Sequence, residues 1–238
     1  MVKVYFGIQI TFILSNCNLI LCHIIGTGNW EVLQTTTEPL EDVAFGDLDG
    51  DGKADIIRAK GGVWEVSHGG TEPFEVLNIA SQTIDELLLG DFDGDGITDL
   101  FVTQEGYWWY YSGGAGVPIQ LNKSGYTVDQ LALGDFDGDG ISDVFSTSEH
   151  EWRWSRSGRQ PWAVLNSSSY TPSNLILADL NGDGVTDVMH IGSDQLVVSW
   201  GGTSHWKLLQ YSGIPQSDIG VGDFDGDNIA DIFVSGCI

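Results

Sequence analysis

A repeat of constant length is the feature that most constrains the fold of this chain. The segment GDFDGDGITDL begins at Gly90, and its relatives begin at Gly46, Gly134, Ala178 and Gly222, so each start lies 44 residues after the previous one. Such a period indicates units that stack on their neighbours, because one unit of this size cannot bury its own apolar surface. The 238 residues therefore predict one repeat domain rather than several unrelated ones.

Short apolar runs within each repeat have the length and composition of β-strands. In one repeat they are LLLGD before the acidic loop, TDLFVT after it, then GYWWYYSGG and PIQLN. These runs are rich in β-branched and aromatic residues and are bounded by Gly, Asn or Ser, and none sustains a helical period. Four strands in a unit of this length are typical of a propeller blade.

The third run of each repeat carries aromatic residues in one register. Trp64, Trp108 and Trp152 share one repeat position, and Tyr110 and Trp154 share the position two residues further on. Alternation along a strand places both positions on the same face of a blade. We expect this face to pack against the neighbouring blade.

The two ends of the chain match complementary halves of one unit. The sequence stops at Ile238, soon after the strand that follows the fifth loop, while NLILCHI at 18–24 and WEVLQ at 30–34 match the two outer strands. The prediction is an all-β, five-bladed β-propeller with four-stranded blades, closed by N-terminal strands that complete the C-terminal blade and leave no open edge. This single domain would span residues 18–238.

Residues 1–17 admit two interpretations. Lys3 followed by an apolar stretch resembles a signal peptide, which predicts a secreted, extracellular or cell-surface protein. TFILSNC at 11–17 also matches DIFVSGC at 231–237, as a strand of a degenerate repeat would. Polar residues interrupt the apolar stretch, so a membrane-spanning helix is not expected.

The acidic balance of the chain excludes two classes of partner. Nine Lys and Arg against 34 Asp and Glu give a formal charge of −25, which repels nucleic acid and anionic membranes. Disorder does not follow, because 42% of the residues are hydrophobic and nine are Trp. We expect a monomer.

Three cysteines, Cys17, Cys22 and Cys237, are too few for a disulfide framework, and their pairing stays open.

The acidic loops follow the pattern D-x-D-G-D-G-x-x-D. The side chains of positions 1, 3, 5 and 9 and the carbonyl group of position 7 offer hard oxygens to one cation, and such a set favours Ca²⁺ over Mg²⁺. The glycines let the backbone curl through positive φ angles. A single copy is sometimes only a polar turn, but five copies in constant register indicate cation binding. Asn181 removes one charge from the fourth loop, so the weakest site is predicted there.

The repeats resemble the FG-GAP/VCBS-type repeats of the integrin-α-like β-propellers, through GDFDGDGITD and its relatives and through the W…SGG…LN segment. The resemblance implies about five Ca²⁺ ions, one per repeat, in the loop between the innermost strand of a blade and the next strand. Only FG at 45–46 remains of the name-giving motif, so integrin-like ligand binding is not implied. The ligands carried over onto this sequence are Asp47, Asp49, Asp51 and Asp55 with the carbonyl group of Lys53; Asp91, Asp93, Asp95 and Asp99 with that of Ile97; Asp135, Asp137, Asp139 and Asp143 with that of Ile141; Asp179, Asn181, Asp183 and Asp187 with that of Val185; and Asp223, Asp225, Asp227 and Asp231 with that of Ile229.

No pattern of a catalytic site is present in the sequence. A nucleophile elbow, a P-loop and a dinucleotide-binding fingerprint are all missing. HEWRW at 150–154 has Trp154 where a zinc-protease motif requires the second His. We therefore do not expect an enzyme.

The function predicted from these features is that of a calcium-stabilised extracellular binding or adhesion module for carbohydrate or protein ligands. Aromatic residues outside the core row suit stacking on sugar rings. The alternatives are the propeller domain of a secreted polysaccharide-acting enzyme and a purely structural repeat module. The aromatic candidates for such stacking are Trp109, Tyr111, Trp162, Trp200 and Trp206.

Overall fold

The computed structural model describes residues 19–23, 30–35, 42–192, 195–211, 219–222 and 229–234. Within these ranges the chain forms β-strands joined by turns, and its helices are single 3-10 turns. No helix in the described part is long and apolar enough to cross a membrane. The predicted all-β class is confirmed.

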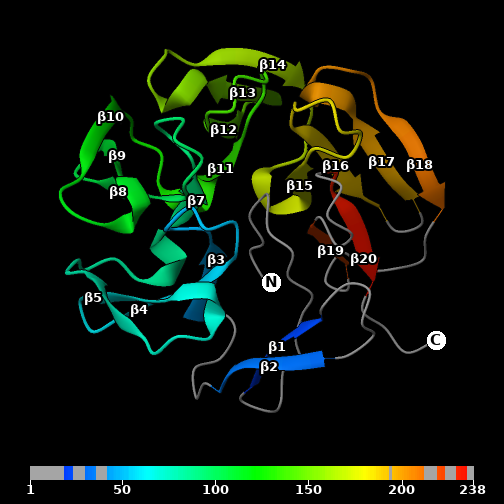
Figure 1. The fold of residues 1–238 in the computed structure, drawn as a ribbon. Coiled ribbons are helices and arrows are strands. Elements are labelled where there is room, and N and C mark those ends of the chain that lie inside the picture. The colour runs from blue at the N-terminus through cyan, green and yellow to red at the C-terminus, as the bar shows by residue number, and fades with distance from the viewer. Residues whose placement is uncertain are drawn as a thin grey trace.

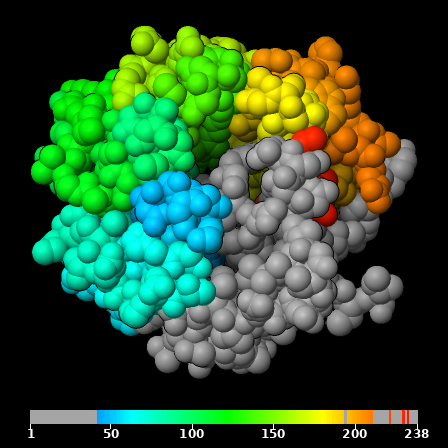
Figure 2. Space-filling view, in the orientation of Figure 1, coloured from blue at the N-terminus to red at the C-terminus, as the bar shows by residue number. Residues whose placement is uncertain are grey.

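Four antiparallel sheets of four strands each follow one another around a central axis, as blades of a propeller (Figure 1). Figure 2 shows the same succession on the surface, from cyan for the first of these blades to orange for the fourth. The strands of each blade run in chain order from the centre outward (Figure 1). The strands are β3 (Val43–Gly46), β4 (Asp55–Lys60), β5 (Val63–Ser67) and β6 (Glu75–Asn78) in blade 1; β7 (Leu88–Gly90), β8 (Asp99–Gln104), β9 (Tyr107–Tyr111) and β10 (Ile119–Lys123) in blade 2; β11 (Leu131–Gly134), β12 (Asp143–Ser148), β13 (Glu151–Ser155) and β14 (Ala163–Ser167) in blade 3; and β15 (Leu175–Ala178), β16 (Asp187–Ile191), β17 (Gln195–Ser199) and β18 (Lys207–Tyr211) in blade 4.

The second strand of each blade is covered on both faces. In β8, the side chains of Leu100, Phe101 and Val102 are fully buried although successive residues point to opposite faces. Blades on either side supply the cover, which is why these strands read as continuous apolar runs rather than alternating ones.

The aromatic row forms the packing between blades, as predicted. Trp64, Trp108 and Trp152 are at most 1% exposed, and each indole N–H donates a hydrogen bond to a backbone carbonyl group, at 2.9, 3.4 and 3.2 Å respectively. Trp108 makes an edge-to-face contact with Trp162 of the next blade, with ring centroids 5.3 Å apart, and Trp152 contacts Trp206 at the same separation. Contacts of this kind add to the burial energy of the rings.

The prediction of five four-stranded blades is wrong, because the residues that the structure describes form four. β1 (Leu19–His23) pairs with β2 (Trp30–Thr35), and β19 (Ile219–Gly222) pairs with β20 (Asp231–Val234), as two separate two-stranded sheets. No ladder joins these two sheets among the described residues, so the N-terminal strands do not complete a C-terminal blade there.

The two short sheets nevertheless keep the register of the repeat. The β1–β2 ladder shifts register between Ile20 and Leu21, and the β5–β6 ladder shifts between Trp64 and Glu65, 44 residues later. The N-terminal strands thus correspond to the outer pair of strands of a blade, as predicted. Register alone did not determine which strands this pair would bond to. The prediction of an export signal or degenerate strand at 1–17 lies outside the described residues.

Candidate metal sites

Each acidic loop of the four blades joins the innermost strand to the second strand. In blade 2, residues 91–98 lie between β7 and β8, and the other loops lie 44 residues before or after. This is the position that the resemblance to FG-GAP repeats implied.

The first aspartate of each loop folds the backbone around its own carboxylate. Asp91 Oδ1 accepts a hydrogen bond from the N–H of Gly94 at 2.6 Å, and Oδ2 accepts one from Gly96 at 2.8 Å. Both glycines have φ near +80°, a conformation that costs other residues energy. Asp47, Asp135 and Asp179 make the corresponding pairs of bonds, which explains why the loop requires glycine at these positions.

The ninth-position aspartate lies under the loop and is fully buried. Asp99 Oδ2 accepts a hydrogen bond from the N–H of Phe92 at 2.7 Å, and Oδ1 accepts one from Gly113 at 3.0 Å, in the turn after the third strand. Asp55, Asp143 and Asp187 are also 0% exposed and bind the equivalent two N–H groups. This residue therefore ties the acidic loop to the turn.

Burial disfavours the charged form of these ninth-position carboxylates. Burial, reinforced by the neighbouring aspartates, raises the pKa of Asp99 and of Asp143 to about 7, against the opposing effect of the two N–H donors. Burial likewise raises the pKa of Asp55 and Asp187. A dication beside such a carboxylate would favour its charged form, so these residues fit a metal site.

Carboxylate oxygens of the first, third and ninth positions converge in two loops. One oxygen each from Asp91, Asp93 and Asp99 lie within 4.8 Å of one another, and the same holds for Asp135, Asp137 and Asp143. Such oxygen-only sets, open to water on one side, suit Ca²⁺. The fifth-position aspartates, Asp95 and Asp139, belong to neither group, and each instead accepts a hydrogen bond from the N–H two residues on.

Loops 1 and 4 depart from this arrangement. In loop 1, Asp47, Asp49 and Asp51 form one group of three, and Asp49, Asp55 and His68 form another. In loop 4 the third position is Asn181, and no group of three His, Cys, Asp or Glu forms there among the described residues. Asp179, Asp183 and Asp187 keep the backbone hydrogen bonds of their positions.

The described part of the fifth loop begins after most of its aspartates. Asp223, Asp225 and Asp227 lie outside the described residues, and Asp231 is the first residue of β20. The N–H of Ala230 donates to the carbonyl oxygen of Asp179 at 2.8 Å. This part of loop 5 therefore binds loop 4.

Neighbouring loops are joined by the same contact around the ring. The N–H of Thr98 donates to the carbonyl oxygen of Asp47 at 2.6 Å, and Ser142 and Thr186 bind Asp91 and Asp135 at the same distance. The residue before each of these donors packs its side chain on a glycine of the preceding loop. Ile141, for example, packs on Gly94, where an added Cβ atom would lie 3.3 Å from the Ile141 side chain. The side chains of these seventh-position residues thus join blades, a role that the sequence analysis missed. Whether the carbonyl groups of Lys53, Ile97, Ile141, Val185 and Ile229 bind a cation stays a prediction.

The first residue of the turn after the third strand differs from blade to blade, and in blades 1 and 3 its side chain contacts the acidic loop. His68, Ser112, Arg156 and Trp200 occupy this position, 44 residues apart. Arg156 Nε lies 2.5 Å from Asp137 and its Nη2 donates to Asp139 at 2.9 Å. In loop 1, Lys53 pairs with Asp51 at 2.7 Å, while His68 Nδ1 lies 3.2 Å from Asp49. The sequence analysis overlooked these residues, although the constant period would have placed them.

The FG-GAP-like repeat family matches residues 91–146 and 135–190 of the chain, which span blades 2 and 3 and the start of blade 4. The protein is an FG-GAP-repeat β-propeller. No curated protein sequence matches it.

Solved structures resemble this FG-GAP propeller in fold. One is a lectin of Agrocybe aegerita, described as specific for non-reducing terminal N-acetylglucosamine, with a TM-score of 0.60 and 18% identity over 92% of this chain. Another is the Tc holotoxin pore of Photorhabdus luminescens, with a TM-score of 0.58 and 17% identity over 86% of this chain. The chain covers 65% of the lectin and 11% of the toxin chain. At these identities the likeness concerns the fold alone.

The aromatic candidates for sugar stacking lie mostly within the packing of the FG-GAP propeller. Tyr111 is 8% exposed and makes an edge-to-face contact with Trp64 at 4.8 Å. Trp162 and Trp206 pack on the tryptophans of the preceding blade, and Trp109 packs against the core between blades 1 and 2. Trp200 is half-buried. None of the described aromatic side chains is fully exposed.

Proposed function

We propose that this FG-GAP propeller is a calcium-stabilised, non-catalytic binding module that works outside the cell. The observation that carries the proposal is the oxygen-only group of Asp91, Asp93 and Asp99 in blade 2, in which the Asp99 carboxylate is fully buried and forms no ion pair with a described residue. A dication at this place would offset the cost of burying Asp99.

Blade 2 is the strongest calcium site under this proposal. No ion pair to Asp91, Asp93 or Asp99 occurs among the described residues, and the nearby Arg159 donates instead to the carbonyl oxygen of Phe92. Arg156 and Lys53, in contrast, pair directly with carboxylates of the loops of blades 3 and 1. A cationic side chain at the loop competes with a bound cation. Calcium sites of extracellular modules bind weakly because they work at the high Ca²⁺ concentrations outside the cell, and we propose that these loops are of that kind.

The ligand of the module is proposed to be a carbohydrate or a protein. The similarity in fold to a lectin favours the carbohydrate, while the buried aromatic residues favour neither class. A purely structural module and the propeller domain of a polysaccharide-acting enzyme are the alternatives. Because several similar blades repeat around the ring, weak individual sites would act together on a multivalent ligand.

The proposal is tested by melting the full chain in excess EDTA and in excess Ca²⁺. Saturating one site at a hundredfold excess over its Kd adds about 2.7 kcal/mol, so several sites should raise the Tm in Ca²⁺ by well over about 10 °C. Asp93→Asn, at an exposed ligand of blade 2, should lower this gain, and Asp85→Asn, on an exposed turn away from the loops, should not. Equal melting curves with and without Ca²⁺ would sink the proposal.

A glycan array in Ca²⁺ separates the ligand classes. Selective binding to defined sugars, terminal N-acetylglucosamine included, that EDTA abolishes would assign a lectin. Turnover of a polysaccharide by the protein alone would instead overturn the non-catalytic role.

A further inference from the structure

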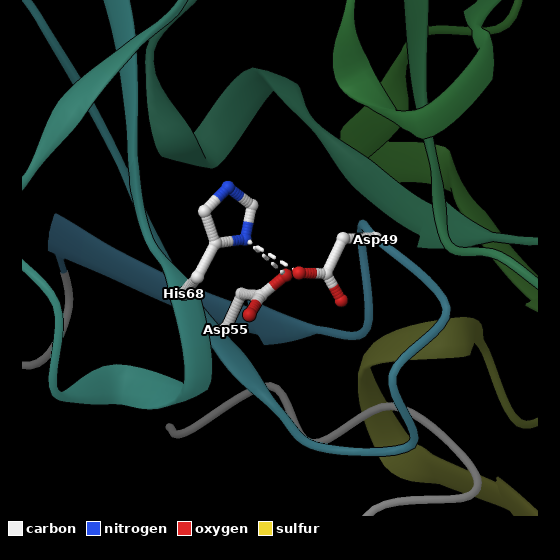
Figure 3. Close-up of side chains that lie close together, drawn as sticks. All are labelled: Asp49, Asp55 and His68. Atoms are coloured by element: carbon white, nitrogen blue, oxygen red, sulfur yellow. Dashed lines mark ion pairs between the residues drawn. The ribbon is translucent and has the colours of Figure 1, made fainter.

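The loop of blade 1 differs from the others in chemistry. His68 comes from the 3-10 turn His68–Gly70, which follows β5, and its ring lies over the acidic loop between β3 and β4 (Figure 3). Its Nδ1 lies 3.2 Å from Asp49 Oδ2 and 3.3 Å from Asp55 Oδ2. The three atoms form a mixed nitrogen and oxygen group that no other described loop has.

The Nδ1 atom of His68 is buried and makes no hydrogen bond. Two carboxylate oxygens nevertheless lie within ion-pair distance of it. A buried polar atom without a hydrogen bond is uncommon, and a cation shared with these two carboxylates would account for it. The opposite nitrogen, Nε2, lies 3.4 Å from Glu75 Oε1, at the start of β6.

Glu75 lies where it would support the tautomer that a metal requires. With a cation on the Nδ1 lone pair between Asp49 and Asp55, the proton would sit on Nε2, beside the Glu75 carboxylate. Histidines that bind metals have this arrangement, with the far ring nitrogen held by a carboxylate. Asp49, Asp55 and His68 thus form an inner shell of donors around one point, and Glu75 forms a second shell behind the histidine.

The spacing of the three donors fits a small cation. Ligand atoms at adjacent corners of a tetrahedron with bonds of about 2.0–2.1 Å lie about 3.3 Å apart. The distances from Nδ1 to the two carboxylate oxygens, 3.2 and 3.3 Å, are close to this value. Three protein ligands and one water would complete a tetrahedral site that stays open to solvent, because Asp49 is exposed.

The chemistry of the donors selects the metal. Calcium takes oxygen ligands almost exclusively, whereas imidazole suits zinc and its neighbours in the first transition row. Lys53, at 2.7 Å from Asp51, further reduces the oxygen ligands that loop 1 offers to calcium. We propose that blade 1 carries a zinc site formed by Asp49, Asp55 and His68, with Glu75 orienting the histidine, while the oxygen-only loops take calcium.

The site builds on the proposal that the acidic loops hold divalent cations, and the two can fail separately. The test is calorimetric titration of Zn²⁺ into the full chain at about pH 8, where imidazole is neutral, with Ca²⁺ in excess. One Zn²⁺ per chain should bind despite the Ca²⁺. His68→Ser, which copies the Ser112 of blade 2, should lower the Zn²⁺ affinity by at least about 100-fold, and Glu75→Gln by about 10- to 100-fold.

Two controls keep the result interpretable. His150→Asn removes a histidine on an exposed turn where asparagine tolerates the positive φ of 69°, and it should leave Zn²⁺ binding unchanged. Visible absorption bands of tetrahedral Co²⁺, present in the wild type and lost in His68→Ser, would report the coordination directly. Zn²⁺ binding that His68→Ser leaves intact, or no Zn²⁺ binding by a chain that binds Ca²⁺, overturns the inference. Histidine-dependent Zn²⁺ binding by a chain that ignores Ca²⁺ upholds it and refutes the calcium proposal.

Discussion

The buried ninth-position aspartates predict an unusual dependence of stability on pH in the metal-free protein. Burial raises the pKa of Asp99 and Asp143 from 3.8 to about 7. The folded chain therefore binds more protons than the unfolded chain between these two values, and its stability falls as the pH rises from about 4 to about 7. Most aspartates act in the opposite direction, because pairing lowers their pKa.

The size of the effect follows from the shift. About three pH units at 1.36 kcal/mol each amount to about 4 kcal/mol per buried carboxylate, or roughly 10 °C in Tm for a chain of this length. Asp51, whose pKa is lowered chiefly by its hydrogen bond with Lys53, titrates below this range and does not mask the trend. Excess Ca²⁺ should abolish the fall, because a dication keeps the carboxylates charged in the folded state.

Urea unfolding in EDTA at several pH values between 4.5 and 7.5 measures this dependence. Asp99→Asn should remove about 1.36 kcal/mol per pH unit from the slope, since one titrating group is lost, and the exposed Asp85→Asn should leave the slope unchanged. A free energy of unfolding that is flat or rises over this range in EDTA would refute the reasoning. The same result would show that water or a side chain compensates Asp99.

Two further predictions concern contacts between and within blades. Arg156→Ser, which copies Ser112 of blade 2, frees Asp137 and Asp139 and should tighten Ca²⁺ at loop 3 by a factor of a few in calorimetry; unchanged binding would show that Arg156 does not compete. Gly134→Ala places a Cβ 2.7 Å from Thr186 Cγ2 and should cost about 1–3 kcal/mol in urea unfolding. Adding Thr186→Ala, which copies the pair Ala178 and Ala230 of the next unit, should restore part of that loss, and a fully additive double variant would contradict the contact.

Most of the fold could be predicted from the repeat, because its period fixes many positions at once. The alternation in the third strand placed Trp64, Trp108 and Trp152 on one face, and the structure buries all three between blades. The number of blades could not be predicted from the repeat. Register placed the N-terminal strands as an outer pair, but whether that pair bonds to β20 depends on a long-range ladder that no local pattern encodes.

The acidic loops were predictable for a related reason. The pattern of glycines requires positive φ angles, and the first aspartate of the loop supplies the acceptors for the N–H groups that this curl exposes. The pattern does not say which carboxylates converge. Asp95 turns to the N–H of Ile97 and leaves Asp91, Asp93 and Asp99 as the converging group, a choice made by local hydrogen bonds rather than by charge.

The repeat pattern does not show that the acidic loops also differ through a residue that lies outside them. The first residue after the third strand, at position 68, 112, 156 or 200, lies 13 residues beyond the ninth-position aspartate. The chain at this position is nevertheless held at the loop, because the aspartate accepts a hydrogen bond from the N–H of the following residue, as Asp99 does from Gly113. The fold thus holds His68 and Arg156 beside the carboxylates of their loops. Serine leaves the loop to a cation, arginine supplies a positive charge of its own, and histidine offers a nitrogen ligand. Five copies of one motif therefore do not imply five equal calcium sites, and the side chain at this position adds to the differences that Lys53 and Asn181 make within loops 1 and 4.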